Sequence, residues 1–583
     1  DTAIYVIARN SGEGSDRSAG KGDYLLSDDE EANLKLLGQN FENVVVVLNV
    51  GGIIDTKFFD EIDGLDSMLL MSQAGMTGGD ALVEVLNGTV NPSGKLTDTW
   101  PVNFDDNPSS EGFANQDGNT AQELYNDDIF VGYRYYDTFG KDVSYEFGYG
   151  GSYTTFAMQT QSVTADKDKV TVKVKVKNTG SVSGKEVAEV YFSAPEGNLD
   201  KPYQELAGYA KTDELAPGES QVLTITYDTT EMGSYDTDKA AYVMEDGDYI
   251  IRVGNSSRNT HVAGKISVAE DTITEQYSNL MVPVKDNPNV ADDEKYPTLE
   301  PMTTEGATPI TYDGEADEIA AASTIAVDFT GYKAPEIIKE NEDVDVYVSN
   351  TTQTEYLIAE NKDGATGEIS RVEKGNANSS DYTVTYNEHV KKFDGDFSKA
   401  TLMDVKLKKL SIEQFVSALS LEELAELVNG HSGDATVKGV AGSSWRNDAK
   451  GITPVNLSDG PAGLRITQKY KDGDQTYYQY ATAWPIGTLL AQTWDTDQIY
   501  AYGEGVGEEM EEFGIGCWLA PGMNIHRNAL CGRNFEYYSE DPVVVGITGT
   551  AATLGVQSNK GVGVTIKHYA LNSQETNRNS ENN

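Results

Sequence analysis

Cysteine is nearly absent from this sequence, because only Cys517 and Cys531 occur among its 583 residues. Two cysteines are too few for a disulfide scaffold, and their separation does not match the Cys-x-x-Cys spacing of zinc sites. We therefore expect free and mostly buried thiols, and no zinc centre.

Basic residues are scarce relative to acidic ones. The chain has 44 Lys and Arg against 94 Asp and Glu, which gives a formal net charge of −50. This charge repels phosphates, so nucleic acid and anionic membrane surfaces are disfavoured as partners. A neutral substrate is compatible with it, and most sugars are neutral.

Long apolar runs are missing as well. No stretch reaches the roughly 20 residues that a membrane span needs. No signal peptide opens the chain, since Asp1 and Thr2 lead directly into the apolar run Ile4 to Ala8. A chain of 583 residues is too long for a single core, so roughly three or four domains are expected.

The first region, residues 1–153, alternates predicted strands and helices. The predicted strands are Ile4–Ala8, Asn43–Val50 and Ser67–Met71, and the predicted helices are Asp28–Asn40 and Gly78–Asn87. The strands are almost wholly apolar, as expected when both faces of a parallel sheet are covered by helices. The pattern indicates part of an α/β sandwich. The Tyr-rich stretch Phe130–Asp137 is expected to pack between its layers.

The second region, residues 154–270, changes to short strands joined by turns. Val170–Lys177 alternates strictly between apolar and polar residues, as a half-buried strand does. Further strands are predicted at Glu186–Phe192, Gln221–Tyr227 and Gly247–Val253. This series is typical of a β-sandwich of immunoglobulin or fibronectin type III character.

The third region, residues 271–405, is expected to be a linker with a small β insert. Asp286–Glu318 is rich in Pro, Thr, Asp, Glu and Gly, the composition of a solvated linker. Short alternating runs at Val344–Val348 and Tyr382–Tyr386 predict the insert.

The fourth region, residues 406–583, returns to an α/β pattern. Two helices are predicted within Ser411–Val428, the second with a capping box formed by Ser420 and Glu423. The other predicted elements are helices at Thr496–Phe513 and Val543–Gln557 and strands at Val455–Leu457, Trp518–Ala520 and Val562–Ile566. Repeated strand–helix units indicate the first part of a TIM-type (β/α)8 barrel.

Polar residues follow each predicted barrel strand. They include Asp459 and Arg465, then Asn524, His526, Arg527, Arg533 and Glu536, then Lys567, His568, Asn572, Glu575 and Arg578. A sugar needs a carboxylate that accepts from two adjacent hydroxyls, and cations that donate to others. Each residue also has a structural interpretation: His526 as a structural histidine, Asp459 as a turn cap, and Arg533 as the partner of Glu536 or Glu540.

The loop Ser11–Arg17 follows the first predicted strand, where α/β sheets place chemistry. Gly12 and Gly14 flank Glu13, so its carboxyl group projects with little shielding. Two interpretations are open: Glu13 is the proton donor of a sugar-cleaving enzyme, or it is an incidental residue in a polar loop.

Six motifs together resemble glycoside hydrolase family 3, of the β-glucosidase type. They are Ser11-Gly12-Glu13-Gly14-Ser15-Asp16-Arg17, Asn91-Pro92-Ser93-Gly94-Lys95-Leu96, Phe147-Gly148-Tyr149-Gly150, Ser458-Asp459-Gly460-Pro461, Gly532-Arg533-Asn534-Phe535-Glu536 and Lys567-His568-Tyr569. The family order is barrel, α/β sandwich, then fibronectin type III-like domain. Here the barrel comes last, as in a subset of bacterial members.

The resemblance assigns a role to seven residues. It implies that Glu13 is the general acid/base and that Asp459 grips two sugar hydroxyls. It implies that the donors around the same sugar are Arg465, Arg533, Lys567, His568 and Arg578. The implied reaction is retaining hydrolysis of short β-glucosides such as cello-oligosaccharides, through a covalent glycosyl-enzyme, with no metal or organic cofactor. Partial burial and the charge of a nucleophile are expected to raise the pKa of Glu13.

The sequence departs from the family at the nucleophile, an Asp followed by Trp. None of the five Trp follows an Asp, and residues 406–583 fall short of the roughly 250 residues of a whole barrel. We therefore expect the chain to be truncated at both ends and to be inactive alone. Its expected partners are a small-molecule carbohydrate and either a further copy of the chain or a complementing chain that supplies the rest of the barrel.

Three other functions are considered. A β-xylosidase of the same family differs only in the room left for one hydroxymethyl group. A β-N-acetylhexosaminidase is disfavoured, because Tyr569-Ala570-Leu571-Asn572 follows His568 in place of that branch's His-containing loop. A non-catalytic carbohydrate-binding or scaffold fragment is favoured by the β-sandwich and by the missing nucleophile.

Overall fold

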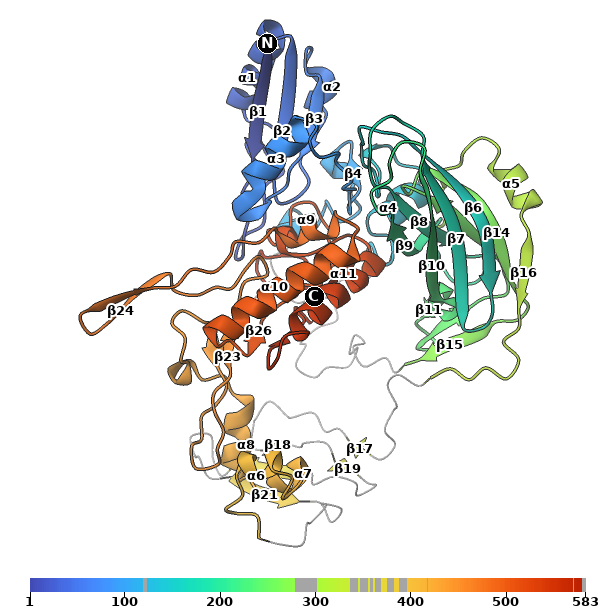
Figure 1. Ribbon diagram of the computed structural model, residues 1–583. Helices are drawn as coiled ribbons and strands as arrows, with labels where there is room; N and C mark the ends of the chain where they lie inside the picture. Colours follow the sequence, from blue (N-terminus) through green and yellow to red (C-terminus); the bar gives the residue numbers. More distant parts are fainter. Residues whose placement is uncertain are drawn as a thin grey trace. The chain divides into compact units, whose positions relative to one another are not determined.

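The computed structural model describes residues 1–118, 123–277, 301–335, 396–416, 418–569 and 571–578, together with the backbone of five short strands between residues 344 and 386 (Figure 1). The chain divides into two compact units. The first comprises residues 1–335 and 458–583, and the second comprises residues 336–457.

The first unit begins with a three-stranded parallel sheet. Its strands, in the order β1-β2-β3, are Thr2–Ala8, Asn43–Asn49 and Ser67–Leu70. The helices are α1 (Asp28–Asn40), α2 (Phe58–Glu61) and α3 (Gly78–Leu86). Ser27 caps α1, because its side chain accepts from the amide of Glu30 while Glu30 bonds back to Ser27. The predicted strands and helices of this region are confirmed.

After this sheet, β4 (Trp100–Pro101) pairs with β5 (Val143–Tyr145), and the short helix α4 (Tyr133–Thr138) lies between these two strands in the sequence. Tyr133 and Tyr136 are buried, and the ring of Tyr133 stacks on Phe147 with centroids 4.6 Å apart. The stretch is buried as expected, but Tyr133 packs against residues of the β-sandwich and the barrel and not between the layers of the α/β sandwich.

A β-sandwich follows. One sheet has the order β10-β7-β6, the other β16-β14-β13-β8-β9, and a third small sheet is β11-β12-β15. The strands are β6 (Phe156–Ala165), β7 (Lys169–Asn178), β8 (Val187–Ser193), β9 (Glu205–Lys211), β10 (Ser220–Asp228), β11 (Ser234–Asp236), β12 (Ala241–Met244), β13 (Gly247–Gly254), β14 (Thr260–Val268), β15 (Thr272–Gln276) and β16 (Thr324–Val327). In β7 every second residue from Val170 to Val176 is fully buried, as its alternation predicts.

The predicted linker needs a correction. Within its described part, Glu315–Ala321 forms helix α5, and β16 pairs in parallel with β14. Val327 of β16 is buried in the core of the sandwich. Residues beyond 270 therefore belong in part to the β-sandwich. The strand β16 lies just after the polar segment Asp286–Glu318, and its four residues are too few for an alternating pattern to reveal it.

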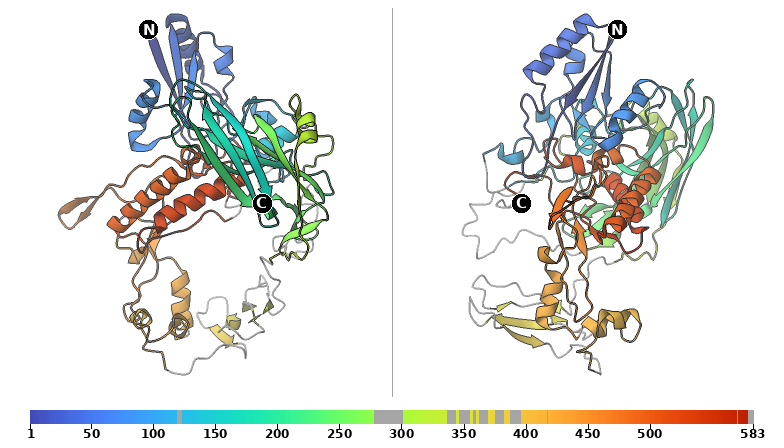
Figure 2. Two further views of the ribbon diagram at one scale, coloured as in Figure 1. Left: turned by 45° about the vertical axis from the view of Figure 1, so that its right-hand side comes forward. Right: turned by 60° about the vertical axis from the view of Figure 1, so that its left-hand side comes forward.

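The barrel residues of the first unit contain two long helices, α10 (Thr496–Phe513) and α11 (Pro542–Gln557), which lie side by side (Figure 2). The short helix α9 (Gly487–Ala491) precedes them. The strands β26 (Cys517–Trp518) and β27 (Gly563–Val564) pair in parallel. A hairpin of β24 (Lys469–Asp472) and β25 (Gln475–Tyr478), which the sequence reading did not predict, projects from this region (Figure 1).

One hydrophobic cluster joins all three domains of the first unit. Its buried members are Tyr133 and Phe147, then Val187, Tyr191 and Leu206 of the β-sandwich, then Ala491, Trp494, Tyr538, Val544 and Val545 of the barrel. The three domains thus share part of one core, which holds their loops in fixed relative positions.

The second unit contains helices α6 (Leu402–Lys406), α7 (Ile412–Val416) and α8 (Leu421–Val428), which pack around Phe415 and Leu419. The predicted capping box of Ser420 and Glu423 is confirmed. Its strands are β17 (Val344–Asp345), β18 (Glu355–Tyr356), β19 (Glu360–Asn361), β20 (Ile369–Lys374), β21 (Tyr382–Tyr386) and β22 (Gly442–Ser443). The last strand, β23 (Asn456–Ser458), ends on the first residue of the segment 458–583 of the first unit. Within the described residues of both units, no helix is long and apolar enough to cross a membrane.

The contact between α10 and α11 depends on glycine. A Cβ atom added at Gly555 would stand 2.2 Å from the carbonyl oxygen of Tyr500. Gly555→Ala is therefore expected to lower the free energy of unfolding by about 1–3 kcal/mol. Gly546 lies in the same helix with no atom within 4 Å of an added Cβ, so Gly546→Ala is the matched control and is expected to raise it by about 0.5 kcal/mol. Urea unfolding followed by tryptophan fluorescence compares the two variants. Equal stabilities would contradict the tight helix contact.

Candidate active site

The loop that carries Glu13 is anchored by a buried arginine. Arg17 pairs with Asp23 at 2.8 Å and donates to the carbonyl oxygens of Ile53 at 2.7 Å and Ala529 at 3.2 Å. Gly14 has a φ of +95°, which a glycine adopts without strain. The turn at Gly14 leaves the side chain of Glu13 47% exposed at the surface of the loop.

Asp459 lies between two cations that come from barrel loops. It directly follows Ser458, the last residue of β23. Lys567 Nζ lies 2.9 Å from Asp459 Oδ1, and Arg465 Nη1 lies 3.3 Å from Asp459 Oδ2. Burial alone would raise the pKa of Asp459, but the hydrogen bond and charge of Lys567 lower it. Asp459 is therefore a charged acceptor at neutral pH.

Arg533 is held by a buried carboxylate. Its Nε donates to Glu536 Oε1, and Glu536 Oε2 lies 3.6 Å from Lys567 Nζ. The side chains of Arg533 and Glu536 are each only about one-twentieth exposed, at 6% and 5%. Glu536 thus fixes the positions of two cations at once. Of the two predicted partners of Arg533, Glu536 is the observed one.

Glu13 meets these cations across the domain boundary. Arg578 Nη2 lies 2.7 Å from Glu13 Oε1, and Arg533 Nη1 lies 3.9 Å from the same oxygen. The hydrogen bond from Arg578 lowers the pKa of Glu13, and this effect outweighs the opposing effect of burial. The expected rise in the pKa is therefore wrong for this structure, because Arg578 lies directly against the carboxylate.

His568 lies in the same site and is held by three polar side chains. Its Nδ1 is 3.1 Å from the hydroxyl of Tyr537 and 3.2 Å from both Asn524 Oδ1 and Asn572 Nδ2. Burial, together with the charges of Arg533 and Lys567, lowers the pKa of His568 to about 4. The imidazole is therefore neutral at neutral pH and serves as a hydrogen-bonding group.

The structure brings all seven predicted site residues into one connected set. Glu13 contacts Arg533 and Arg578, Arg533 shares Glu536 with Lys567, Lys567 binds Asp459, and Asp459 binds Arg465. His568 is the chain neighbour of Lys567. Arg465 lies at the rim, with a side chain 70% exposed.

The sequence reading gave no role to Asp16, which accepts backbone hydrogen bonds from Gly532, Glu575 and Thr576. The only sequence signal was its place in the motif Gly14-Ser15-Asp16-Arg17. A carboxylate that accepts hydrogen bonds from backbone amides cannot be recognised from the sequence, because every residue type except proline carries a backbone amide donor.

Two other polar residues of the barrel loops hold the domains together. His526 Nδ1 lies 2.6 Å from Asp98 Oδ1, which supports its structural interpretation, although within the described residues its buried Nε2 has no hydrogen-bond partner. Buried Arg527 pairs with Asp127 at 2.9 Å and Glu123 at 2.6 Å.

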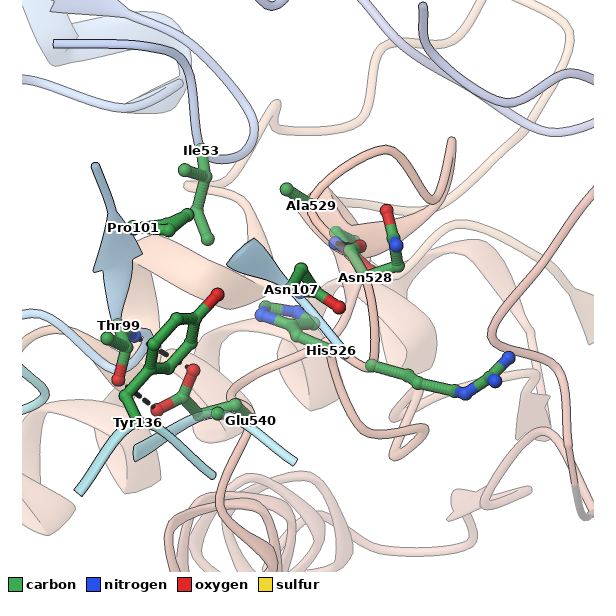
Figure 3. A pocket seen from close by; sticks show the side chains of 12 residues that line it. Ile53, Thr99, Pro101, Asn107, Tyr136, His526, Asn528, Ala529 and Glu540 are labelled. Carbon is green, nitrogen blue, oxygen red and sulfur yellow. Dashed lines mark hydrogen bonds between the residues drawn. The ribbon is translucent and has the colours of Figure 1, made fainter. Parts of the chain in front are cut away.

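Glu540 is also structural. It accepts from the amide and hydroxyl of Thr99 and from the amide of Tyr133, at 2.7–2.8 Å. It lines a small cavity with Thr99, Tyr136 and His526 (Figure 3), and none of the seven predicted site residues lines that cavity. The predicted alternative pairing of Arg533 with Glu540 is therefore wrong.

The arrangement combines an accessible carboxylate with a set of fixed donors and acceptors. Four carboxylates, those of Glu13, Asp459, Glu536 and Glu575, alternate with four cations, those of Arg465, Arg533, Lys567 and Arg578. Such a set can hold a neutral polyhydroxylated molecule through many charge-assisted hydrogen bonds. The exposed carboxylate of Glu13 can exchange a proton with that molecule.

Family models match three parts of the chain in order. They are described as Glycosyl hydrolase family 3 C-terminal domain, at residues 1–133, Fibronectin type III-like domain, at residues 186–257, and Glycosyl hydrolase family 3 N terminal domain, at residues 403–581. The order confirms the predicted placement of the barrel after the other two domains.

The chain is similar over nearly its whole length to parts of three named proteins. The chain is 35% identical to beta-glucosidase A of Butyrivibrio fibrisolvens, covering 99% of this chain and 68% of that protein. It is also 35% identical to a beta-glucosidase of Ruminococcus albus, covering 99% of this chain and 53% of that protein. The solved beta-glucosidase of Paenibacillus barengoltzii is 32% identical with a TM-score of 0.72, and the match covers 100% of this chain and 57% of that one. The chain thus spans between about half and two thirds of the proteins that it resembles.

The charge environment of His568 predicts its titration. Only five histidines occur in the sequence, so carbon NMR of histidine-labelled protein resolves them, and His568→Asn identifies the signal. The imidazole is expected to titrate near pH 4, since burial and two cations lower its pKa to about 4. Lys567→Met removes one of these cations and is expected to raise the midpoint. Lys560→Met, an exposed lysine outside the site, is the matched control. A midpoint at the ordinary histidine value would contradict this environment.

Proposed function

Because the chain belongs to glycoside hydrolase family 3, we propose that its gene product is a retaining β-glucosidase. The proposed substrates are short β-glucosides, from which it removes the terminal non-reducing β-D-glucosyl residue. Relatives from two organisms that align over 99% of this chain are named beta-glucosidases, which supports glucose over xylose.

One observation carries the proposal: Glu13, on a loop of the first domain, lies 2.7 Å from Arg578 on a loop of the barrel. A carboxylate that can transfer a proton therefore stands at the rim of a set of donors and acceptors suited to sugar hydroxyls. A non-catalytic binding protein would need the barrel residues but has no use for an exposed carboxylate delivered from another domain.

We assign a role to each of the seven residues. Asp459 accepts from two adjacent hydroxyls of the glucosyl unit, because Lys567 and Arg465 keep it charged. Arg533, Lys567 and Arg578 donate to the same sugar, and Arg465 donates from the rim. Neutral His568 has one donor and one acceptor nitrogen, so it can accept a hydrogen bond, which an ammonium or guanidinium group cannot do.

The proposed reaction has two steps. A nucleophilic carboxylate attacks the anomeric carbon and forms an ester bond, while the bond to the leaving oxygen breaks and that oxygen takes the proton of Glu13. Glu13 then accepts a proton from water, whose oxygen attacks the anomeric carbon and frees the nucleophile. We assign no nucleophile within the 583 residues, because no Trp in them follows an Asp. The proposal therefore concerns the complete gene product.

The acid step requires Glu13 to be protonated when substrate is bound. In this structure the hydrogen bond from Arg578 lowers the pKa of Glu13. A bound sugar hydroxyl that accepts from Arg578 would remove this hydrogen bond, and the sugar would also exclude water from the carboxyl group. Both changes raise the pKa, so substrate binding itself would prepare the acid.

Glu13→Gln is expected to affect substrates according to their leaving groups. A poor leaving group needs the proton of Glu13, so kcat/KM for phenyl β-glucoside should fall by about 10²–10⁴-fold. A dinitrophenyl group leaves without a proton, so kcat/KM for that glucoside should change little. Activity of the complete gene product on both glucosides measures the difference. Absence of turnover by the wild type would refute the proposed function, and unchanged hydrolysis of phenyl β-glucoside by the variant would refute the role of Glu13.

Arg578→Gln is expected to shift the alkaline limb of kcat/KM to higher pH. The free enzyme is active with Glu13 protonated, so the rate falls as pH rises through the pKa of Glu13. Arg578 lowers that pKa, so its removal raises it and the fall occurs at higher pH. Arg465→Gln, which removes a cation bound to Asp459 on the other side of the site, is the matched control: it should lower kcat/KM without moving the limb. A shift to lower pH in Arg578→Gln would contradict the assignment.

A further inference from the structure

The loop of Glu13 is fastened to the barrel by backbone hydrogen bonds that end on a single carboxylate. Asp16 Oδ1 accepts from the amides of Gly532 and Glu575 at 3.0 Å each, and Asp16 Oδ2 accepts from the amide of Thr576 at 2.7 Å. The amide of Glu575 also lies 3.0 Å from Oδ2. Both oxygens of Asp16 therefore have donors from the barrel, and these donors come from two different loops.

A second carboxylate makes the reciprocal contact. The side chain of Glu575 is fully buried, and its Oε2 accepts from the amide of Gly14 at 2.7 Å. The same oxygen lies 3.0 Å from Arg578 Nη1. Asp16 of the loop thus accepts from backbone amides of the barrel, and Glu575 of the barrel accepts from the backbone amide of Gly14 in the loop.

The two surfaces also fit closely between these contacts. A Cβ added at Gly532 would stand 2.0 Å from the carbonyl oxygen of Ser15, so the loop lies directly against this glycine. The amide of Arg17 donates to the carbonyl oxygen of Leu530 at 2.8 Å. The loop therefore has no room to slide along the barrel.

The contacts of Asp16 place Glu13 relative to its cations. Gly532 precedes Arg533, and Thr576 stands two residues before Arg578. These two arginines contact the carboxylate of Glu13 at 3.9 Å and 2.7 Å. A shift of the loop relative to Gly532 and Thr576 would change the distance from Glu13 to both guanidinium groups and to a sugar held by them.

We propose that Asp16 and Glu575 are positioning residues of the general acid: they set the place of Glu13 through the backbone at Gly14, Gly532 and Thr576. This inference rests on the proposed function, since it concerns proton donation by Glu13. Neither residue takes part in the chemical steps. A misplacement of about 1 Å costs up to about 10²-fold in rate, so precise docking of this loop is needed for proton transfer.

The test compares two leaving groups in Asp16→Asn of the complete gene product. The amide nitrogen of Asn would face backbone N–H groups, so the loop should move away from the barrel. The value of kcat/KM for phenyl β-glucoside is expected to fall by about 10²-fold, while kcat/KM for dinitrophenyl β-glucoside changes little. The inhibition constant of glucose should stay unchanged, because the residues proposed to hold the sugar are intact. Asp29→Asn, an exposed residue in the first turn of α1, is the control and should behave as wild type.

Gly532→Ala is the second variant. Its methyl group would displace Ser15 without changing any charge, so it should show the same dependence on the leaving group. Equal loss on both substrates in both variants would overturn the inference, since it would indicate general damage to the fold. Full activity on phenyl β-glucoside in both variants would also overturn it.

The outcome separates this inference from the proposed function. If the wild type hydrolyses neither glucoside, the proposed function fails. If the wild type and Glu13→Gln behave as expected but Asp16→Asn and Gly532→Ala show no dependence on the leaving group, only the positioning role fails.

Discussion

The site depends on carboxylates that accept hydrogen bonds across a domain boundary. Asp16 and Glu575 do this around the loop of Glu13, and Glu540 does it for Thr99 and Tyr133. Such bonds are strong because one partner is charged. Loss of one partner would leave a charge or an amide buried without compensation, which costs more than the bond itself contributes. The loops of the α/β sandwich and of the barrel are therefore held in one arrangement.

The site also balances its charges locally, although the chain as a whole carries a formal net charge of −50. Asp459, Glu536 and Glu575 each lie beside at least one Lys or Arg. This balance keeps Asp459 ionised as an acceptor and keeps the cations in place as donors. Glu13 has the greatest exposure of these carboxylates and bonds to Arg578, a residue that is also proposed to bind sugar. Proton affinity at Glu13 and occupation of the sugar site are thereby linked through one guanidinium group.

The spacing of apolar residues predicted most of the helices and strands, because this spacing follows from which side chains are buried. The helices Asp28–Asn40 and Thr496–Phe513 have the predicted bounds, and the valines of β7 alternate as expected. The errors have a common cause. β16 is only four residues long, and its place in the sandwich comes from pairing with β14, which is distant in sequence. The predicted direction of the pKa shift at Glu13 was wrong, because its hydrogen-bond partner is Arg578, which lies 565 residues away in the sequence.

The sequence by itself determined which residue types are available to the site: a carboxylate between two glycines, polar residues after barrel strands, and motifs that resemble one family. These features are local, so they can be recognised without a fold. Only the tertiary structure decided which of several carboxylates meets which cation. It placed Glu536, and not Glu540, beside Arg533, and it turned Asp16 toward the backbone of the barrel. Pairings of this kind depend on how separate loops meet in space. Hydrogen bonds form only at contact distance, so the sequence order of the partners carries no information about them.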